Sequence, residues 1–128
     1  ERIRKHKDER GAGWATFEEP LKLSEIIEET KDKYSVVVLD CLTLWLSNLM
    51  MADADVNNEI EKFLNALQIK HQTSRLFIVS NEVGMGIVPE NELARRFRDT
   101  AGFVNQKAAA IADEAYLVTA GIPIKIKG

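Results

Sequence analysis

Two short apolar runs and one helical repeat dominate the middle of the chain. Tyr34 to Leu39 ends in Val-Val-Val-Leu, a continuous β-branched run typical of a parallel strand covered on both faces. Leu76 to Val79 is a second run of the same kind. Between them, four apolar residues have the i, i+3, i+4, i+7 spacing of an amphipathic helix: Ile60, Phe63, Leu64 and Leu67. Asn57 or Asn58 would cap this helix. This order predicts a right-handed crossover that brings both strand ends to one sheet edge.

Three further helices are expected around this unit. Ser24 is a candidate N-cap for a short helix that ends near Lys31. Residues 42–51 are almost wholly apolar, which indicates a helix buried on most sides or packed against a neighbouring subunit. Pro89 is expected to open a long helix, because an apolar stripe follows it over two dozen residues and continues past Gly102.

The two ends of the chain predict short strands. Trp14, Thr16 and Phe17 alternate with small residues as in a strand, and the tryptophan is expected in the core. Ala115 to Thr119 reads as another strand, and isoleucines alternate with proline and lysines in residues 122–127. The connection at Gly121 is too short for a crossover, so this last pair should form an antiparallel edge.

Acidic and amide side chains stand where the two apolar strands end. Asp40 terminates the first, and a buried strand ending in an acid resembles the Walker B arrangement, in which the carboxylate holds Mg²⁺ beside nucleotide phosphates. Asn81 and Glu82 follow the second, placed for a phosphate-bound metal or a substrate hydroxyl. The alternative is structural, because Asp favours turns and a glycine-containing loop can simply turn a corner.

A histidine in the charged opening segment is the candidate nucleophile. His6 lies among Arg4, Lys5, Lys7 and Arg10, whose positive charge favours its neutral form and leaves a ring nitrogen free to attack a phosphate. The alternative is an exposed histidine on a solvated helix.

Composition narrows the class of protein further. The chain has 128 residues and a net charge of −3, which fits one globular α/β domain and argues against general nucleic-acid binding. Cys41 is the one cysteine, so no internal disulfide can form and a reducing, cytoplasmic location is expected. The longest apolar run is too short to cross a membrane.

Three segments resemble one enzyme family over nearly the whole chain. Residues 81–106 read NEVGMGIVPEN followed by RxFRDxxGxxNQ, residues 2–10 read RIxxHKDxR, and residues 40–49 read DCLTLWLSNL. These motifs are similar to those of the bifunctional adenosylcobinamide kinase / adenosylcobinamide-phosphate guanylyltransferases of cobalamin biosynthesis.

The resemblance implies a mechanism and a set of site residues. His6 would be guanylylated by GTP and pass GMP to adenosylcobinamide phosphate, and a kinase step with ATP or GTP would first phosphorylate adenosylcobinamide. Asp40 would position Mg²⁺, and Glu82 is a weaker candidate for a metal or hydroxyl contact. The expected nucleotide-binding residues are Lys7, Asp8, Glu9, Arg10, Glu18 and Asp40. The family also implies a homotrimer.

One part of the family pattern is absent from these residues. No G-x-x-x-x-G-K-[ST] phosphate loop occurs in the sequence, although a P-loop kinase needs one to bind its triphosphate. The expectation is therefore a RecA-like P-loop α/β domain, a mostly parallel sheet with an antiparallel C-terminal edge, whose first strand, loop and helix precede Glu1. Two alternatives stay open: a different P-loop small-molecule kinase, and a non-catalytic binding protein without the loop.

Overall fold

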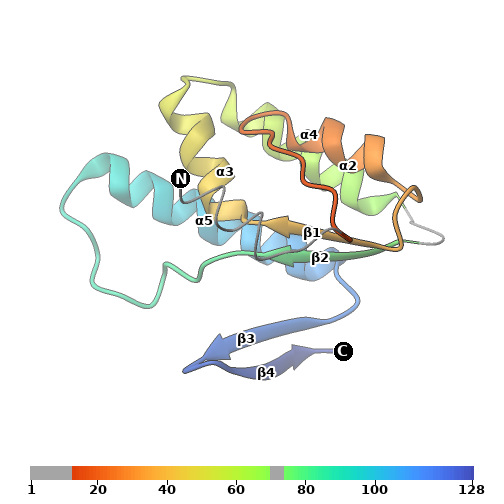
Figure 1. The fold of residues 1–128 in the computed structure, drawn as a ribbon. Helices are drawn as coiled ribbons and strands as arrows, with labels where there is room; N and C mark the ends of the chain where they lie inside the picture. Colours follow the sequence, from red (N-terminus) through yellow and green to blue (C-terminus); the bar gives the residue numbers. More distant parts are fainter. Residues whose placement is uncertain (1–12, 70–73) are drawn as a thin grey trace.

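The computed structural model describes residues 13–69 and 74–128 as helices packed on one face of a short parallel sheet, followed by a hairpin (Figure 1). The elements in chain order are α2 (Leu23–Thr30), β1 (Val36–Asp40), α3 (Leu42–Met51), α4 (Val56–Gln68), β2 (Arg75–Val79), α5 (Glu92–Ile111), β3 (Ala115–Thr119) and β4 (Ile122–Lys127). The predicted β1, α4 and β2 unit is present, and so are the long final helix and the C-terminal hairpin.

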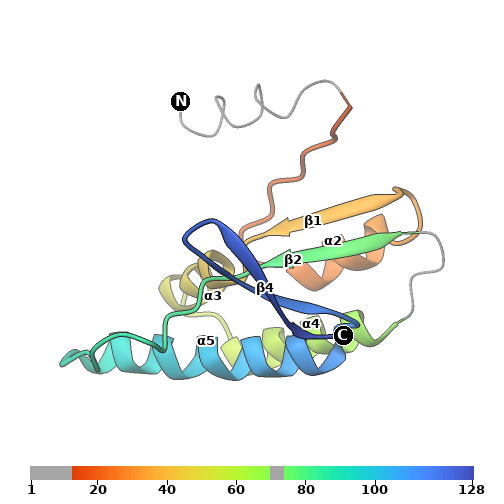
Figure 2. The same ribbon diagram turned by 90° about the horizontal axis from the view of Figure 1, so that it is seen from below.

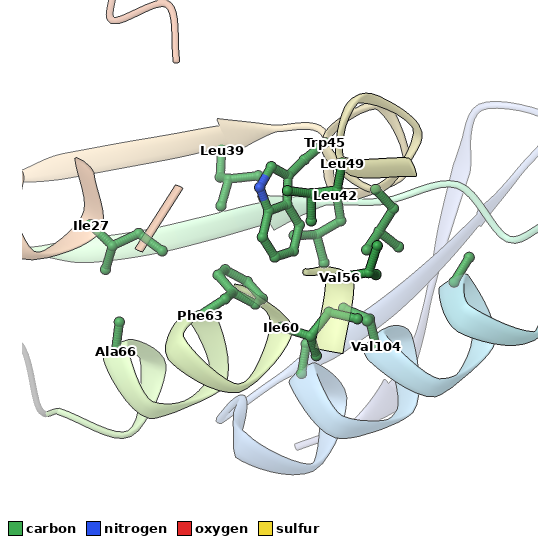
Figure 3. Packing of buried hydrophobic residues seen from close by; sticks show 13 residues of the cluster. Ile27, Leu39, Leu42, Trp45, Leu49, Val56, Ile60, Phe63, Ala66 and Val104 are labelled. Carbon is green, nitrogen blue, oxygen red and sulfur yellow. The ribbon is translucent and has the colours of Figure 1, made fainter. Parts of the chain in front are cut away.

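The core lies between the helices and one face of the parallel sheet (Figure 3). Phe63 of α4 is fully buried, and its ring lies 5.1 Å from that of Trp45 on α3. Leu39 reaches this cluster from β1, and Val104 reaches it from α5. Because the four helices contribute their apolar stripes to one cluster, the periodicity that predicts the helices also identifies much of the core.

The parallel pairing of β1 and β2 is as predicted, but the sheet does not extend to the C-terminal strands. Val36 pairs with Arg75 and Asp40 with Val79, in one uninterrupted register. β3 pairs antiparallel with β4 in a separate sheet. Among the described residues, the parallel pair and the antiparallel pair are therefore separate sheets, and no pairing joins β2 to β3 (Figure 1 and Figure 2).

Among the described residues, the parallel sheet is covered on one face. Leu39 is buried and Ile78 packs against the core, whereas the alternate side chains of Val38 and Phe77 are about half exposed. Successive strand residues point to opposite faces, so the helices cover one set and leave the other to solvent. The prediction that β1 is covered on both faces does not hold among the described residues.

Several predicted element ends are also wrong. Ser24 lies in the first turn of α2 and is buried, and the Glu19 carboxylate instead accepts from the amides of Leu21 and Lys22 just before that helix. Asp55 rather than Asn57 or Asn58 caps α4, accepting from the Asn58 amide at 3.2 Å. Asn91 caps α5 through the Ala94 amide, so the helix begins three residues after Pro89.

The predicted strand near Trp14 is absent, since residues 14–19 are neither helix nor strand. Trp14 is 49% exposed, so its expected place in the core is wrong. The Phe17 ring packs instead edge-on against Tyr34, with centroids 5.9 Å apart. Alternating large and small residues are a weak strand signal without a neighbouring strand to pair with.

Candidate nucleotide site at the carboxyl edge of the parallel strands

The parallel register brings the ends of β1 and β2 to one edge of the sheet. Asp40 lies opposite Val79, and Asn81 and Glu82 follow within three residues. The Asp40 side chain is exposed and makes no hydrogen bond or ion pair within residues 13–69 and 74–128. This carboxylate is therefore available to a ligand, at the edge where open α/β sheets bind their ligands.

A hydrogen bond between side chains links the two strand ends. Asn81 donates from Nδ2 to Oγ1 of Thr43, at 2.8 Å. Thr43 is buried in the first turn of α3, and its hydroxyl lies 3.4 Å from Sγ of Cys41, the residue after Asp40. The amide of Asn81 thus fixes the start of α3 against the end of β2, beside the Asp40 carboxylate.

The loop after β2 holds Glu82 close to its own backbone. One carboxylate oxygen, Oε1, accepts from the Gly84 amide at 2.7 Å. A Cβ on Gly84 would lie 2.9 Å from that same oxygen, so a larger residue there would displace the end of the Glu82 side chain. The second oxygen, Oε2, has no hydrogen bond in the described part of the chain, which leaves Glu82 able to bind a hydroxyl or a metal.

The segment that carries Glu18 is attached to α3. Trp45 donates from Nε1 to the Leu21 carbonyl at 2.7 Å, and Asn48 donates from Nδ2 to the Pro20 carbonyl at 3.2 Å. The Leu21 and Lys22 amides hold the pKa of Glu19 below its ordinary value by bonding to the ionised carboxylate. Glu18 itself is exposed, two residues before this attachment.

The donor set fits a magnesium ion that is shared with a nucleotide. Among the described residues, no three His, Cys, Asp or Glu side chains converge as a metal cluster. Mg²⁺ is usually held by one or two carboxylates together with substrate phosphates, so the exposed Asp40 suffices on the protein side. Zinc or calcium cages need more protein ligands than the described residues provide at this edge.

The first half of α5 carries a surface hollow and two arginines that bind the loop after β2. A shallow hollow of about 430 Å³ is lined by side chains on the first half of α5: Glu92, Arg95, Arg96, Asp99 and Thr100. Arg95 binds the Pro89 and Glu90 carbonyls, and Arg98 binds the Gly84 carbonyl. In residues 13–69 and 74–128, no helix is both long and apolar enough to cross a bilayer.

Five predicted site residues lie outside the part of the chain that the structure describes: His6, Lys7, Asp8, Glu9 and Arg10. The structure does bring Asp40 and Glu82 to the same sheet edge. The polar contacts that organise this edge were missed, and they involve Thr43, Ser80 and Asn105. Their one signal was the presence of polar residues inside otherwise apolar segments.

The fold defines an α/β protein whose two parallel strands end at one edge, where proteins of this class commonly bind ligands. Residues 1–126 match the family model described as cobinamide kinase / cobinamide phosphate guanyltransferase. The chain belongs to this family.

Three relatives resemble the chain over almost its full extent. The bifunctional adenosylcobalamin biosynthesis protein CobU of Salmonella typhimurium is 40% identical, with 98% of this chain and 77% of the relative covered. CobU of Escherichia coli gives the same figures. The bifunctional adenosylcobalamin biosynthesis protein CobP of Pseudomonas aeruginosa is 38% identical, with 99% of this chain and 73% of the relative covered.

Proposed function

We propose that this chain phosphorylates adenosylcobinamide and then transfers GMP from GTP to the product, giving adenosylcobinamide-GDP. The observation that carries this proposal is the family match over residues 1–126, which spans every segment expected to hold a site residue. The exposed Asp40 at the ligand-binding edge of the sheet supports it independently. The bifunctional names of three relatives agree with two activities on one polypeptide.

The guanylyl transfer proceeds through two displacements. A neutral ring nitrogen of His6 attacks the α-phosphorus of GTP, forming a P–N bond as the α–β P–O bond breaks and pyrophosphate leaves. A phosphate oxygen of adenosylcobinamide phosphate then attacks the same phosphorus and displaces the histidine. Covalent catalysis of this kind divides one difficult transfer into two easier ones.

Charged side chains stabilise these steps. Lys7 and Arg10 neutralise charge that develops on the phosphate oxygens, while Asp8, Glu9 and Glu18 contact the nucleotide. Asp40 holds Mg²⁺, which supplies electrostatic stabilisation of the phosphate charge when it is bound. The Thr43 and Asn81 contact keeps the surroundings of Asp40 in place, and Glu82 orients the aminopropanol hydroxyl or a ligand of the metal.

The complete fold is proposed to be a RecA-like P-loop domain. Within the described residues, β2 pairs only with β1, and β3 pairs only with β4. One further parallel strand between β2 and β3 would join both pairs into a mixed sheet, and a phosphate loop after that strand would face the Asp40 edge. The triphosphate that serves the kinase step is ATP or GTP.

A homotrimer in the cytoplasm completes the proposal. The α3 helix leaves Leu44 59% exposed and Met51 83% exposed, and apolar side chains of this size are suited to a subunit contact. Light scattering of the purified protein, coupled to size exclusion, measures the number of subunits directly. A trimer mass supports the assignment, and a monomer at micromolar concentration contradicts it.

Product analysis tests both activities together. The full-length gene product is incubated with adenosylcobinamide, Mg²⁺ and either ATP or GTP. The corrinoid products are then separated by chromatography and identified by mass spectrometry. The proposal predicts adenosylcobinamide phosphate with whichever triphosphate serves the kinase step, and adenosylcobinamide-GDP when GTP is present. Adenosylcobinamide phosphate without adenosylcobinamide-GDP would indicate a kinase alone, and an unchanged corrinoid would indicate a binding protein.

A further inference from the structure

One stripe of α5 holds the loop that joins β2 to this helix, here called the post-β2 loop, residues 80–91 (Figure 1). Arg95, Arg98 and Asn105 are spaced by three and seven residues, which places them along one side of a helix. Ala101, Val104 and Ala108 form the neighbouring buried side. The stripe therefore borders the core and follows the loop.

Each residue of the stripe contacts the loop at a different point. Asn105 accepts from the Ser80 hydroxyl at Oδ1, at 2.6 Å, and donates from Nδ2 to the Asn81 carbonyl, at 3.3 Å. Arg98 donates to the Gly84 carbonyl, and Arg95 to the carbonyls of Pro89 and Glu90. The two arginines thus bind backbone in the middle and at the end of the loop, and Asn105 fixes its beginning.

The contacts of Asn105 continue to the Asp40 edge. The backbone of Asn81 is held by Asn105, and the side chain of Asn81 holds Thr43. Thr43 lies three residues from Asp40, and Glu82 directly follows Asn81. A displacement of Asn81 would therefore move Glu82 and release the start of α3 at the same time.

We infer that Asn105 is a positioning residue, which acts through Ser80 and Asn81 to set the placement of Glu82 relative to Asp40. The inference rests on the proposed function for its catalytic consequence, although the hydrogen bonds themselves do not depend on it. A misplacement of reacting groups by about 1 Å can cost about 100-fold in rate, so a distant tether can control turnover.

The first test separates turnover from binding. In the full-length gene product, Asn105→Ala should lower kcat for corrinoid phosphorylation by about 10- to 100-fold and leave KM for the triphosphate near the wild-type value. Asn65→Ala is the matched control, since Asn65 is an exposed amide on α4 that makes no hydrogen bond in the described residues. A decrease below twofold in Asn105→Ala, or an equal decrease in Asn65→Ala, would overturn the inference.

A second variant keeps the test decisive if Asn105→Ala fails to fold. Ser80→Ala removes one hydroxyl, and it should also lower kcat without a matching change in KM. An unchanged kcat in Ser80→Ala would contradict the tether. Where Asn105→Ala folds, the double variant should be no slower than Asn105→Ala alone, because both changes break the same tether. Fully multiplicative losses would show that the two residues act independently and would contradict the tether.

Amide hydrogen exchange tests the tether without any assay of activity. Asn105→Ala removes two hydrogen bonds, and at their usual net strength the Gly84 amide, which donates to Glu82 Oε1, should exchange about 5- to 30-fold faster. Unchanged exchange would refute the tether even if kcat fell. An inactive wild-type protein would refute the proposed function, and the exchange rates would still decide on the tether.

Discussion

Replacing Trp45 by phenylalanine should destabilise the protein far more than the same change at Trp14. Trp45 is 4% exposed, packs 5.1 Å from the Phe63 ring and donates to the Leu21 carbonyl at 2.7 Å. Phenylalanine keeps an aromatic ring in the cluster but has no donor for that carbonyl. The substitution therefore removes a hydrogen bond and leaves a small void where the rest of the indole was.

The expected cost follows from these two losses. An unsatisfied, partly buried carbonyl costs about 1–3 kcal/mol, and the missing ring atoms add to it. The total should be about 2–4 kcal/mol of unfolding free energy. Trp14 is 49% exposed and makes no hydrogen bond in the described residues, so Trp14→Phe should change stability by less than about 0.5 kcal/mol.

Urea denaturation followed by far-ultraviolet circular dichroism measures both variants against the parent protein. This signal does not depend on either tryptophan, so the fitted free energies are comparable. Equal destabilisation by the two substitutions, or a cost below about 0.5 kcal/mol at Trp45, would refute the packing described for α3 and the attachment of the Glu18 segment.

Three further predictions test other parts of the account. Phe63→Ala should lower the unfolding free energy by about 3–5 kcal/mol, measured by urea denaturation, because a fully buried ring leaves a cavity at the centre of the core. The Tyr116 hydroxyl, and after it Lys125, lowers the pKa of Glu114 below 4.5. The stabilisation of the folded protein by this carboxylate is therefore present above pH 4.5 and is lost as the pH falls through the folded-state pKa. NMR titration should show the pKa of Glu114 rise toward 4.5 in Tyr116→Phe, and an unchanged pKa would contradict the hydrogen bond. Asp40→Asn should reduce kcat for phosphorylation by at least about 100-fold while the circular dichroism spectrum stays the same, and a variant with near-normal turnover would exclude Asp40 as the Mg²⁺ ligand.

The strongest sequence patterns predicted the elements that bury the most apolar surface. The β-branched run before Asp40 and the repeat of Ile60, Phe63, Leu64 and Leu67 both form the expected elements. Their periods match the geometry of strands and helices, and the residues that set the period are those that pack. The alternation in residues 122–127 likewise predicted β4 and its antiparallel pairing.

Helix ends were less predictable because several polar residues compete for the same cap. Asp55 and Asn57 can each accept from a nearby amide, and only the path of the backbone selects Asp55. Ser24 was expected to cap α2 but lies in its first turn. The Glu19 carboxylate instead binds the Leu21 and Lys22 amides just before the helix. Such choices are decided by tertiary structure rather than by local preference.

The candidate site also has parts that the sequence predicts and parts that it does not. The placement of Asp40 and Glu82 at one edge was predictable, because Asp40 ends one recognisable strand, Glu82 follows the next, and parallel strands end at one edge. The contacts of Asn105 with Ser80 and Asn81 join residues about two dozen positions apart, and no local pattern indicates which polar side chains will meet. Packing of α5 against the helices of the core brings them together.

Covalent labelling with GTP tests the central claim most directly. The full-length gene product is incubated with α-labelled GTP and Mg²⁺, precipitated, and treated separately with acid and with alkali. The account predicts a protein-bound label that is labile in acid and stable in alkali, is absent in His6→Ala, and leaves the protein when adenosylcobinamide phosphate is added. A label that persists in His6→Ala, or no label on a protein that phosphorylates adenosylcobinamide, would contradict guanylyl transfer through this histidine.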